Sequence, residues 1–313
     1  MTQINFNGNH VLSNLVTSKS LPVYTCERFE NSCTFNHVNL TLTDYKWQPA
    51  AEDPETIELV RFFSSNIPVV YDNICKTFPS LKNFQVIRQG VHEITEDAFH
   101  SCKNLQALIF ANNFIKKLPP NIFKGLTNLE HIEISDNQLQ GFSTPDLFSD
   151  LPKLKALYLE VNNITQLPAD MFKTNQKLQY LWMSSNDLSD IEVEKFLEYL
   201  PELQNFYIND NEISCARAVD IIKILEDKRM KYNNLYELKV RYYSKEVVFD
   251  RFTCVPDVSW MAAHYRKENS KIIEYMKDNE KNLNEKIKLL EEKLSSFEKI
   301  EEALEKLIEL SQK

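Results

Sequence analysis

One spacing of apolar residues occurs seven times along this chain of 313 residues, and it restricts the possible folds more than any other feature. In the stretch "LEHIEISDNQLQGF", residues 129–142, apolar side chains stand at offsets 0, 3, 5, 10 and 13, and Asn137 stands at offset 8. This spacing fits neither an α-helix nor a strand over its whole length. The copies begin 24 or 25 residues apart, at Ile57, Leu81, Leu105, Leu129, Leu154, Leu178 and Leu203.

Each copy has the pattern of one turn of a stacked coil. Apolar residues at offsets 3 and 5 alternate as in a short strand with one buried side, and those at offsets 10 and 13 lead back across a core. Repeated at a fixed period, such units predict a curved solenoid with a parallel sheet on its concave face, each coil burying its apolar side against its neighbours. A second apolar pair closes the coil on the convex side, as in Ile122/Phe123, Leu147/Phe148 and Met171/Phe172.

The residue at offset 8 turns the chain, and its amide side chain can bond backbone groups of neighbouring coils. It is Asn113, Asn137, Asn162, Asn186 and Asn211 in the last five copies, and Ser65 and Gln89 in the first two. The resulting pattern LxxLxLxxNxL resembles the signature of the leucine-rich-repeat family, closely in five copies and loosely in two, over about residues 57–215. This resemblance implies a horseshoe-shaped α/β solenoid.

A solenoid needs covered ends, and the flanking segments have the features of caps. We predict an N-terminal segment and cap over residues 1–56, with an edge strand in "HVNLTL", residues 37–42, and seven repeats over 57–214. A C-terminal cap follows over 215–256, with an amphipathic helix at 216–227. It resembles the cysteine-flanked cap of extracellular leucine-rich-repeat proteins, although it lacks their usual four cysteines. Residues 257–313 are predicted to form a helical coiled coil.

The six cysteines fall in positional pairs, as in a disulfide framework. Cys26 and Cys33 would close a loop in the N-terminal cap, and stacking of consecutive coils would place Cys75 within bridging reach of Cys102. Cys215 and Cys254 flank the C-terminal block. Buried free thiols are the alternative interpretation, and a count of thiols under denaturing, non-reducing conditions distinguishes the two.

Two Asn-x-Thr triplets, at Asn39 and Asn163, are candidate glycosylation sites. Together with the cysteines they favour an extracellular, secreted protein, although the start "MTQINFNGNHVLSNLV" shows no signal peptide. A leader missing from this chain would reconcile these observations. No apolar run of about 18 residues, the length needed to span a bilayer, occurs in the chain.

The tail carries a heptad pattern from Ile273 to Ser311 in which nine of twelve core positions are apolar, which predicts a coiled coil. Lys286 and Lys293 precede Glu291 and Glu298 by five residues, the spacing that pairs opposite charges across a parallel dimer. Glutamates at core positions 280 and 301 weaken a homodimer because like carboxylates would face each other, so a heterodimer is a reasonable alternative. A single helix folding back on the solenoid is the other interpretation.

The side chains between the core positions of each strand form the concave face, where a protein ligand could bind. Three successive large rings, Tyr158, Trp182 and Tyr207, stand in one predicted column, with Tyr180 beside them. Such anchors among charged residues are typical of protein recognition, whereas rings that merely stack would stabilise the sheet. The predicted binding residues are His131, Glu133, Tyr158, Glu160, Tyr180, Trp182 and Tyr207, with Asp136 and Asp210 nearby.

Several function classes are disfavoured by the sequence. The net charge of −9 at pH 7 disfavours nucleic acid as a partner. No GxSxG, HExxH or P-loop motif occurs, and only four glycines are present, so we expect neither an enzyme nor a cofactor. His131, Glu133 and Asp136 could be viewed as a metal or acid-base cluster, but a solvated polar patch is the more common outcome on a strand, and we predict no metal site.

Repeats of extracellular type followed by a coiled coil resemble the leucine-rich-repeat immune proteins of mosquitoes and related insects. In that family the coiled coil joins two such proteins, and the complex escorts a complement-like thioester protein in the haemolymph. The sparser cysteines near this tail put a covalent link between partners in doubt. The resemblance therefore implies a secreted recognition or scaffold protein of innate immunity. The alternatives are a receptor ectodomain whose membrane anchor is absent from this chain, and a cytosolic adaptor with reduced cysteines.

Overall fold

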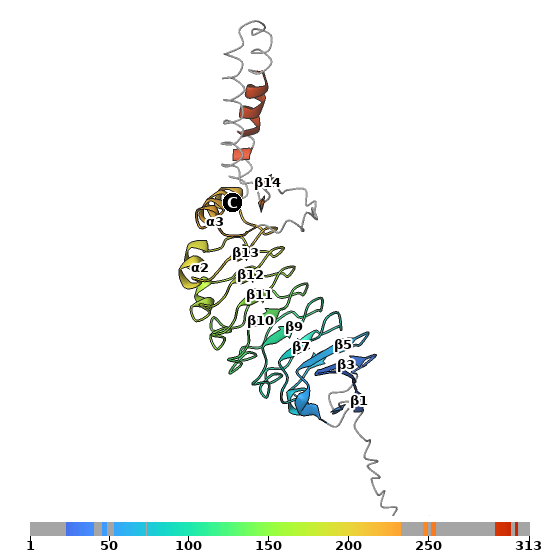
Figure 1. Cartoon of the computed structure of the whole chain (residues 1–313). Helices are drawn as coiled ribbons and strands as arrows, with labels where there is room; N and C mark the ends of the chain where they lie inside the picture. Colours follow the sequence, from blue (N-terminus) through green and yellow to red (C-terminus); the bar gives the residue numbers. More distant parts are fainter. Residues whose placement is uncertain are drawn as a thin grey trace, which may run out of the picture.

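The structure, a computed structural model, describes residues 23–40, 46–48, 53–72, 74–232, 247–249, 252–254, 292–301 and 304–305. Side chains of the segments 46–48, 247–249 and 252–254 are not described. Figure 1 shows one stack of coils that runs from the N-terminal strands, in blue, to helix α3, in orange. The repeat pattern therefore folds as predicted, into a solenoid.

Within the described residues, nine strands form the main sheet in the order β13-β12-β11-β10-β9-β7-β5-β3-β2. All neighbours pair in parallel except β2 and β3, which form an antiparallel hairpin. Each predicted repeat contributes one strand, with offset 3 at its buried position. The strands are β2 (Glu27–Phe29), β3 (Ser32–Asn36), β5 (Leu59–Phe63), β7 (Asn83–Gln85), β9 (Ala107–Ile109), β10 (His131–Glu133), β11 (Ala156–Tyr158), β12 (Tyr180–Trp182) and β13 (Asn205–Tyr207).

The N-terminal cap extends the repeat stack by one further coil. Its strand β3 pairs with β5 over residues 32–36, so the edge strand predicted at 37–42 is misplaced; residues 41 and 42 lie outside the described part. Cys33, Phe35, Val38 and Leu40 are buried and stand 27 residues before the matching core and turn positions of the first repeat. Of the leucines of the signature the coil has only Leu40, and it lacks the asparagine, which is why the sequence pattern missed it.

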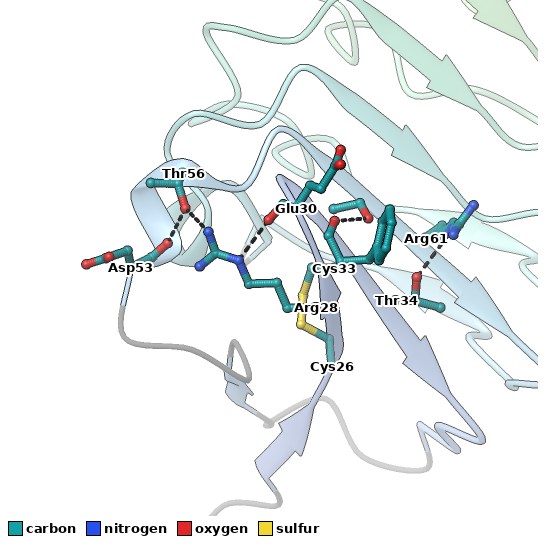
Figure 2. Close-up of a disulfide and its surroundings, with 10 residues drawn as sticks. Cys26, Arg28, Glu30, Cys33, Thr34, Asp53, Thr56 and Arg61 are labelled. Carbon is teal, nitrogen blue, oxygen red and sulfur yellow. Dashed lines mark hydrogen bonds between the residues drawn. A yellow bond between two sulfur atoms is a disulfide. The ribbon is translucent and has the colours of Figure 1, made fainter.

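The outer strand of this cap is held by a disulfide and a hydrogen-bond network. Cys26 and Cys33 are disulfide-bonded, as predicted, across the β2-β3 hairpin (Figure 2). Arg28 donates from Nε to the carbonyl oxygen of Glu30 and from Nη2 to Oγ1 of Thr56, at 2.8 and 2.7 Å (Figure 2). Thr56 ends the short 3-10 helix η1 (Pro54–Thr56), so this network joins the edge hairpin to the helix that leads into the first repeat. A separate strand pair joins β1 (Val23–Thr25) to β4 (Lys46–Gln48).

A ladder of buried asparagines lies at offset 8 and bonds the backbone of adjacent coils. Asn137 accepts from the backbone N–H of Ile115 at 3.0 Å and donates to the carbonyl oxygens of Phe110 and Ser135 at 2.9 and 3.0 Å. Asn113, Asn162, Asn186 and Asn211 make equivalent bonds. In the first repeats, Ser65 accepts from the N–H of Val38, and Gln89 accepts from the N–H of Ser65. The predicted role of this position is confirmed.

The residue before each of these turn residues adopts a left-handed backbone conformation, and in no described repeat is it a glycine. The φ angle there lies between 48° and 59° in the seven repeats, and it is 55° at Val161. A β-branched residue with positive φ is a rare and strained conformation. The strain is tolerated because the N–H of Val161 and of Asn162 each donates to the next coil, to Ser184 and Ser185.

The convex side is closed by short helices and turns over a column of phenylalanine rings. Phe148 stacks between Phe123 and Phe172 with ring centroids 5.8 and 5.3 Å apart, and Phe172 contacts Phe196 at 5.6 Å. All four rings are buried, as predicted for the three apolar pairs. The convex and lateral elements are α1 (Ile74–Thr77), η2 (Ala169–Phe172), α2 (Val193–Tyr199), and the pair β6 (Val69–Val70) and β8 (Glu93–Ile94). Cys75 of α1 bonds Cys102 of the next coil, the predicted second disulfide.

The C-terminal end of the stack is covered by helix α3 (Cys215–Asp227), one residue longer than the predicted helix. Ser214 caps its N-terminus by accepting from the N–H of Arg217. The Arg217 guanidinium bonds Asp190 at 2.9 Å and Glu194 at 3.1 Å, which ties α3 to the last turns of the repeats. Because this guanidinium donates to it, the pKa of the Glu194 carboxyl is lowered.

Cys215 is disulfide-bonded, but the side chain of its expected partner Cys254 lies outside the described residues. An antiparallel pair joins β14 (Val247–Phe249) to β15 (Phe252–Cys254). Most of the predicted coiled coil also lies outside the described residues; within them, 292–301 are helical, and Leu294 and Phe297 are each 38% exposed. No helix among the described residues is both long and apolar enough to cross a membrane.

Candidate protein-binding face

Side chains at offsets 2, 4 and 6 point away from the core and form what we call the concave face. The strand register places Glu133, Tyr158, Trp182 and Tyr207 directly beside one another on β10 to β13. Neighbouring parallel strands lie about 4.8 Å apart, so side chains in one column must contact each other. The structure therefore places Tyr158, Trp182 and Tyr207 in one column, as the repeat spacing predicted.

The rings of this column form a continuous contact series. Ring centroids are 4.6 Å apart between Tyr158 and Trp182, and 5.1 Å apart between Trp182 and Tyr207, with planes inclined by 59° and 67°. His131, one column away, meets the ring of Tyr158 at 5.0 Å and 67°. We call these four residues the aromatic ladder. All four are half-buried, so each ring both packs on its neighbours and keeps part of its surface in solvent.

The remaining predicted residues surround the aromatic ladder. Tyr180 lies on β12 in the same column as His131, separated from it by the buried Ala156. Glu133 is 3.7 Å from His131 through its Oε2 atom, and its Oε1 atom accepts from the hydroxyl of Ser135 at 3.2 Å. Glu160 stands at offset 6 on the concave face, and Asp136 and Asp210 stand at offset 7, in the turns that follow β10 and β13. The structure therefore brings all the predicted residues onto one surface.

The chemical environment of the aromatic ladder is desolvated and negative. Burial raises the pKa of the Tyr158 hydroxyl, and the nearby carboxylates of Glu160 and Glu133 raise it further. Burial also raises the pKa of Tyr207. Both tyrosines therefore stay neutral through physiological pH, as hydroxyl groups that can donate a hydrogen bond.

Two polar atoms of the aromatic ladder, Nε1 of Trp182 and Nε2 of His131, have no hydrogen-bond partner among the described residues. The Nε1–H group of Trp182 is shielded from solvent, and no group in the described part of the chain accepts from it. Buried donors are normally bonded in folded proteins, and leaving one without an acceptor costs free energy. An incoming ligand with an acceptor at this point would remove that cost.

A second group of outward-facing residues in the N-terminal repeats was missed by the sequence prediction. Phe63 and Ile87 are adjacent in one column and are 52% and 37% exposed. Arg61 lies over the Phe63 ring at 5.5 Å and donates to Thr34 at 3.0 Å. Phe29, at the outer edge of the sheet, is 73% exposed. Reading the same offsets in the first two repeats would have found Phe63 and Ile87, whereas Phe29 lies outside the repeats.

The two candidate glycosylation sites are exposed and occupy equivalent places in their coils. Asn39 and Asn163 both stand one residue after the turn position, on a lateral edge of the solenoid. Asn39 accepts from Asn66 at 3.0 Å, and Asn163 donates to Asp187 at 3.3 Å. A glycan on either residue would project from the lateral edge and would leave the concave face accessible.

Comparison with known proteins agrees with this architecture. The leucine rich repeat family model matches residues 79–139, 103–164, 142–188 and 152–213. Together these matches span residues 79–213, and over that span the chain is similar to the leucine-rich-repeat family. It resembles the mosquito leucine-rich-repeat immune proteins, as the sequence predicted.

Two solved structures illustrate this resemblance. A chain in the crystal structure of the LRIM1/APL1C complex is similar with a TM-score of 0.56 and 25% sequence identity. The crystal structure of the APL1 leucine-rich repeat domain is similar with a TM-score of 0.54 and 24% identity. Each comparison covers 62% of this chain but 36% and 49% of those chains, so this chain spans about a third to a half of their length. No curated protein matches the sequence.

Proposed function

We propose that this protein recognises another protein through its concave face, with the aromatic ladder as the central anchor, and that it performs no catalysis. The observation that carries this proposal is the contact series of half-buried rings fixed by the strand register. A rigid sheet positions these rings before binding, which lowers the entropy lost on association. Large aromatic anchors supply most of the energy in protein interfaces.

The proposal predicts that Trp182→Ala combined with Tyr207→Ala abolishes partner binding with little loss of folding. Each substitution removes a ring from the surface and leaves the buried leucines and asparagines in place. The measurement is affinity capture on immobilised full chain from the extracellular fluid of the source organism, followed by identification of bound proteins. Circular dichroism of the variant checks that the solenoid is retained.

Phe114→Ala is a matched control, because Phe114 is 53% exposed and lies away from the concave face, where it stacks on His92 at 6.4 Å. Proteins captured by wild type and by Phe114→Ala, but not by the double variant, would support the site. Equal capture by all three forms would refute it, and the rings would then serve only to stabilise the sheet.

We also propose that the tail joins two chains through a coiled coil. The heptad pattern supports this, and so does the partial exposure of the apolar Leu294 and Phe297 on the described helical segment. The likeness to a chain of the LRIM1/APL1C complex, a complex of two named proteins, is a further support.

The tail proposal predicts that the full chain sediments or elutes with twice the mass of one chain, and that a truncation after Tyr265 is monomeric. In the full chain, Leu294→Asp should shift the equilibrium toward the monomer, because it places a carboxylate in the helix interface. Size-exclusion chromatography with light scattering measures all three forms. A full chain with the same monomeric mass as the truncation would contradict the proposal.

Secretion and a role in innate immunity complete the proposed function. Two disulfides are characteristic of an oxidising compartment, and both candidate glycosylation sites are exposed. Mass spectrometry of the protein isolated from its source, before and after enzymatic removal of N-glycans, tests this directly. Two free thiols at Cys75 and Cys102 in that material would contradict secretion.

A further inference from the structure

The concave face carries opposite charges in its two halves. On β10 to β13 and the turns after them, the described outward-facing carboxylates are those of Glu133, Asp136, Glu160 and Asp210. At the corresponding positions of β5, β7 and β9 the charged residues are Arg61 and Arg88. Four carboxylates therefore surround the aromatic ladder, and two guanidinium groups lie on the N-terminal half of the same sheet.

The aromatic ladder itself favours a positive charge. The faces of tyrosine and tryptophan rings carry negative potential, and a cation within about 6 Å of a ring centroid is attracted to it. Glu133 lies beside Tyr158 in the strand register, and Asp136 is exposed three residues further on. The raised pKa of Tyr158, caused first by burial and then by Glu160 and Glu133, agrees with a negative environment.

A basic side chain that reaches the rings would also bring its own backbone close to Trp182. The Nε1–H group of Trp182 is buried and has no acceptor, and a peptide carbonyl oxygen is the commonest acceptor in proteins. An arginine residue supplies a planar cation that stacks on rings and bonds carboxylates with several donors at once.

We propose that the protein partner presents an arginine-containing basic segment to the aromatic ladder. This inference rests on the proposed function and specifies the chemistry of the partner at that site. The guanidinium lies on the rings of Tyr158 and Trp182 near Glu133, and a backbone carbonyl of the segment accepts from Trp182. Arg61 and Arg88 repel the same segment, so it is confined to the C-terminal half of the concave face.

The test uses the full chain labelled with ¹⁵N at the tryptophan indoles, with the Trp182 signal assigned by its loss in Trp182→Phe. The probe is the blocked peptide Gly-Arg-Gly-Arg-Gly, and its counterpart is Gly-Glu-Gly-Glu-Gly. We expect the arginine peptide to shift the Trp182 signal with a dissociation constant of about 1 mM, which weakens as salt is added. The glutamate peptide should leave the signal unchanged.

Charge variants test whether the carboxylates contribute. Glu133→Gln combined with Asp136→Asn should weaken binding of the arginine peptide by about threefold to tenfold. Arg88→Gln is the matched control, because it changes one exposed charge on the same face and should not weaken binding. An unchanged affinity in the Glu133 and Asp136 variant would overturn the inference.

The failure of this inference can be told apart from failure of the proposed function. No shift of the Trp182 signal, or an equal shift with both peptides, would overturn the inference. If captured proteins are nevertheless lost in the Trp182 and Tyr207 double variant, the proposed function stands and the partner meets the rings with other chemistry. If the arginine peptide binds as expected, the inference is supported, and a captured partner should lose its affinity when its surface arginines are replaced by glutamine.

Discussion

Phe148→Ala is expected to lower the free energy of unfolding by about 4 kcal/mol, the largest effect that we predict for a single substitution. The ring is fully buried and contacts Phe123, Phe142 and Phe172 at centroid distances of 5.3 to 5.8 Å. Alanine would leave a cavity in the middle of the convex column, and the neighbouring coils are fixed by their own backbone bonds and could not collapse into it. Urea unfolding followed by circular dichroism measures the loss.

The position of Phe148 also predicts how unfolding proceeds. Each coil of a solenoid contacts only its neighbours, so a weak coil in the middle can separate the unfolding of the two halves. Native-state hydrogen exchange should then show lower protection around β10 and β11 than around β7. Phe114→Ala removes the same atoms from an exposed site and should change the unfolding free energy by no more than about 0.5 kcal/mol. A loss below about 1 kcal/mol in Phe148→Ala would contradict the importance of this column.

Asn137→Ala is expected to lower the free energy of unfolding by about 3 kcal/mol, although it removes few atoms. The side chain is 8% exposed and bonds one N–H and three carbonyl oxygens of two adjacent coils at distances of 2.9 to 3.3 Å. Alanine would leave the N–H of Ile115 buried without an acceptor, and the carbonyl oxygens of Phe110 and Ser135 would each lose one of their donors. Gln140→Ala, an exposed position three residues later, is the matched control and should have little effect.

Asn137→Asp separates the loss of hydrogen bonds from the loss of volume. Its carboxylate would face carbonyl oxygens, so burial among acceptors should raise its pKa in the folded protein above the unfolded value of about 3.9. The folded state then binds more protons than the unfolded state, and the stability relative to wild type should fall as the pH rises above about 4. Unfolding curves at pH 4 and pH 7 measure this difference. An equal deficit at both values would show that the side-chain bonds contribute little.

Much of the fold could be predicted from the sequence because the repeat is specified locally. The spacing fixed which residues enter the core, and Leu129, Ile132, Ile134 and Leu139 are all buried. The same spacing also predicted that Asn137 lies in a turn, because offset 8 is the position at which a polar residue recurs between the apolar positions of the repeat. The disulfide between Cys75 and Cys102 was also predictable, since stacking places equivalent points of consecutive coils close together.

The additional coil in the N-terminal cap could not be predicted from the repeat pattern. Its core residues Cys33 and Phe35 are apolar but are not leucines, and its distance to the next coil is 27 residues instead of 24 or 25. Pairing with β5 and the bond from Val38 to Ser65 complete the coil, and both depend on the neighbouring repeat. The left-handed backbone conformation at Val161 could not be predicted from the sequence either, because the hydrogen bonds that support it come from the next coil.

Some features of the candidate site could likewise be predicted from the sequence, and others required the tertiary structure. The sequence alone determined the column that contains Tyr158, Trp182 and Tyr207, because a fixed repeat length places equal offsets side by side. Only the tertiary structure decided that the ring planes are inclined and that the Trp182 N–H is shielded without an acceptor among the described residues. The physical reason is that spacing along the chain specifies which residues are neighbours, whereas ring orientation and solvent access depend on packing between adjacent coils.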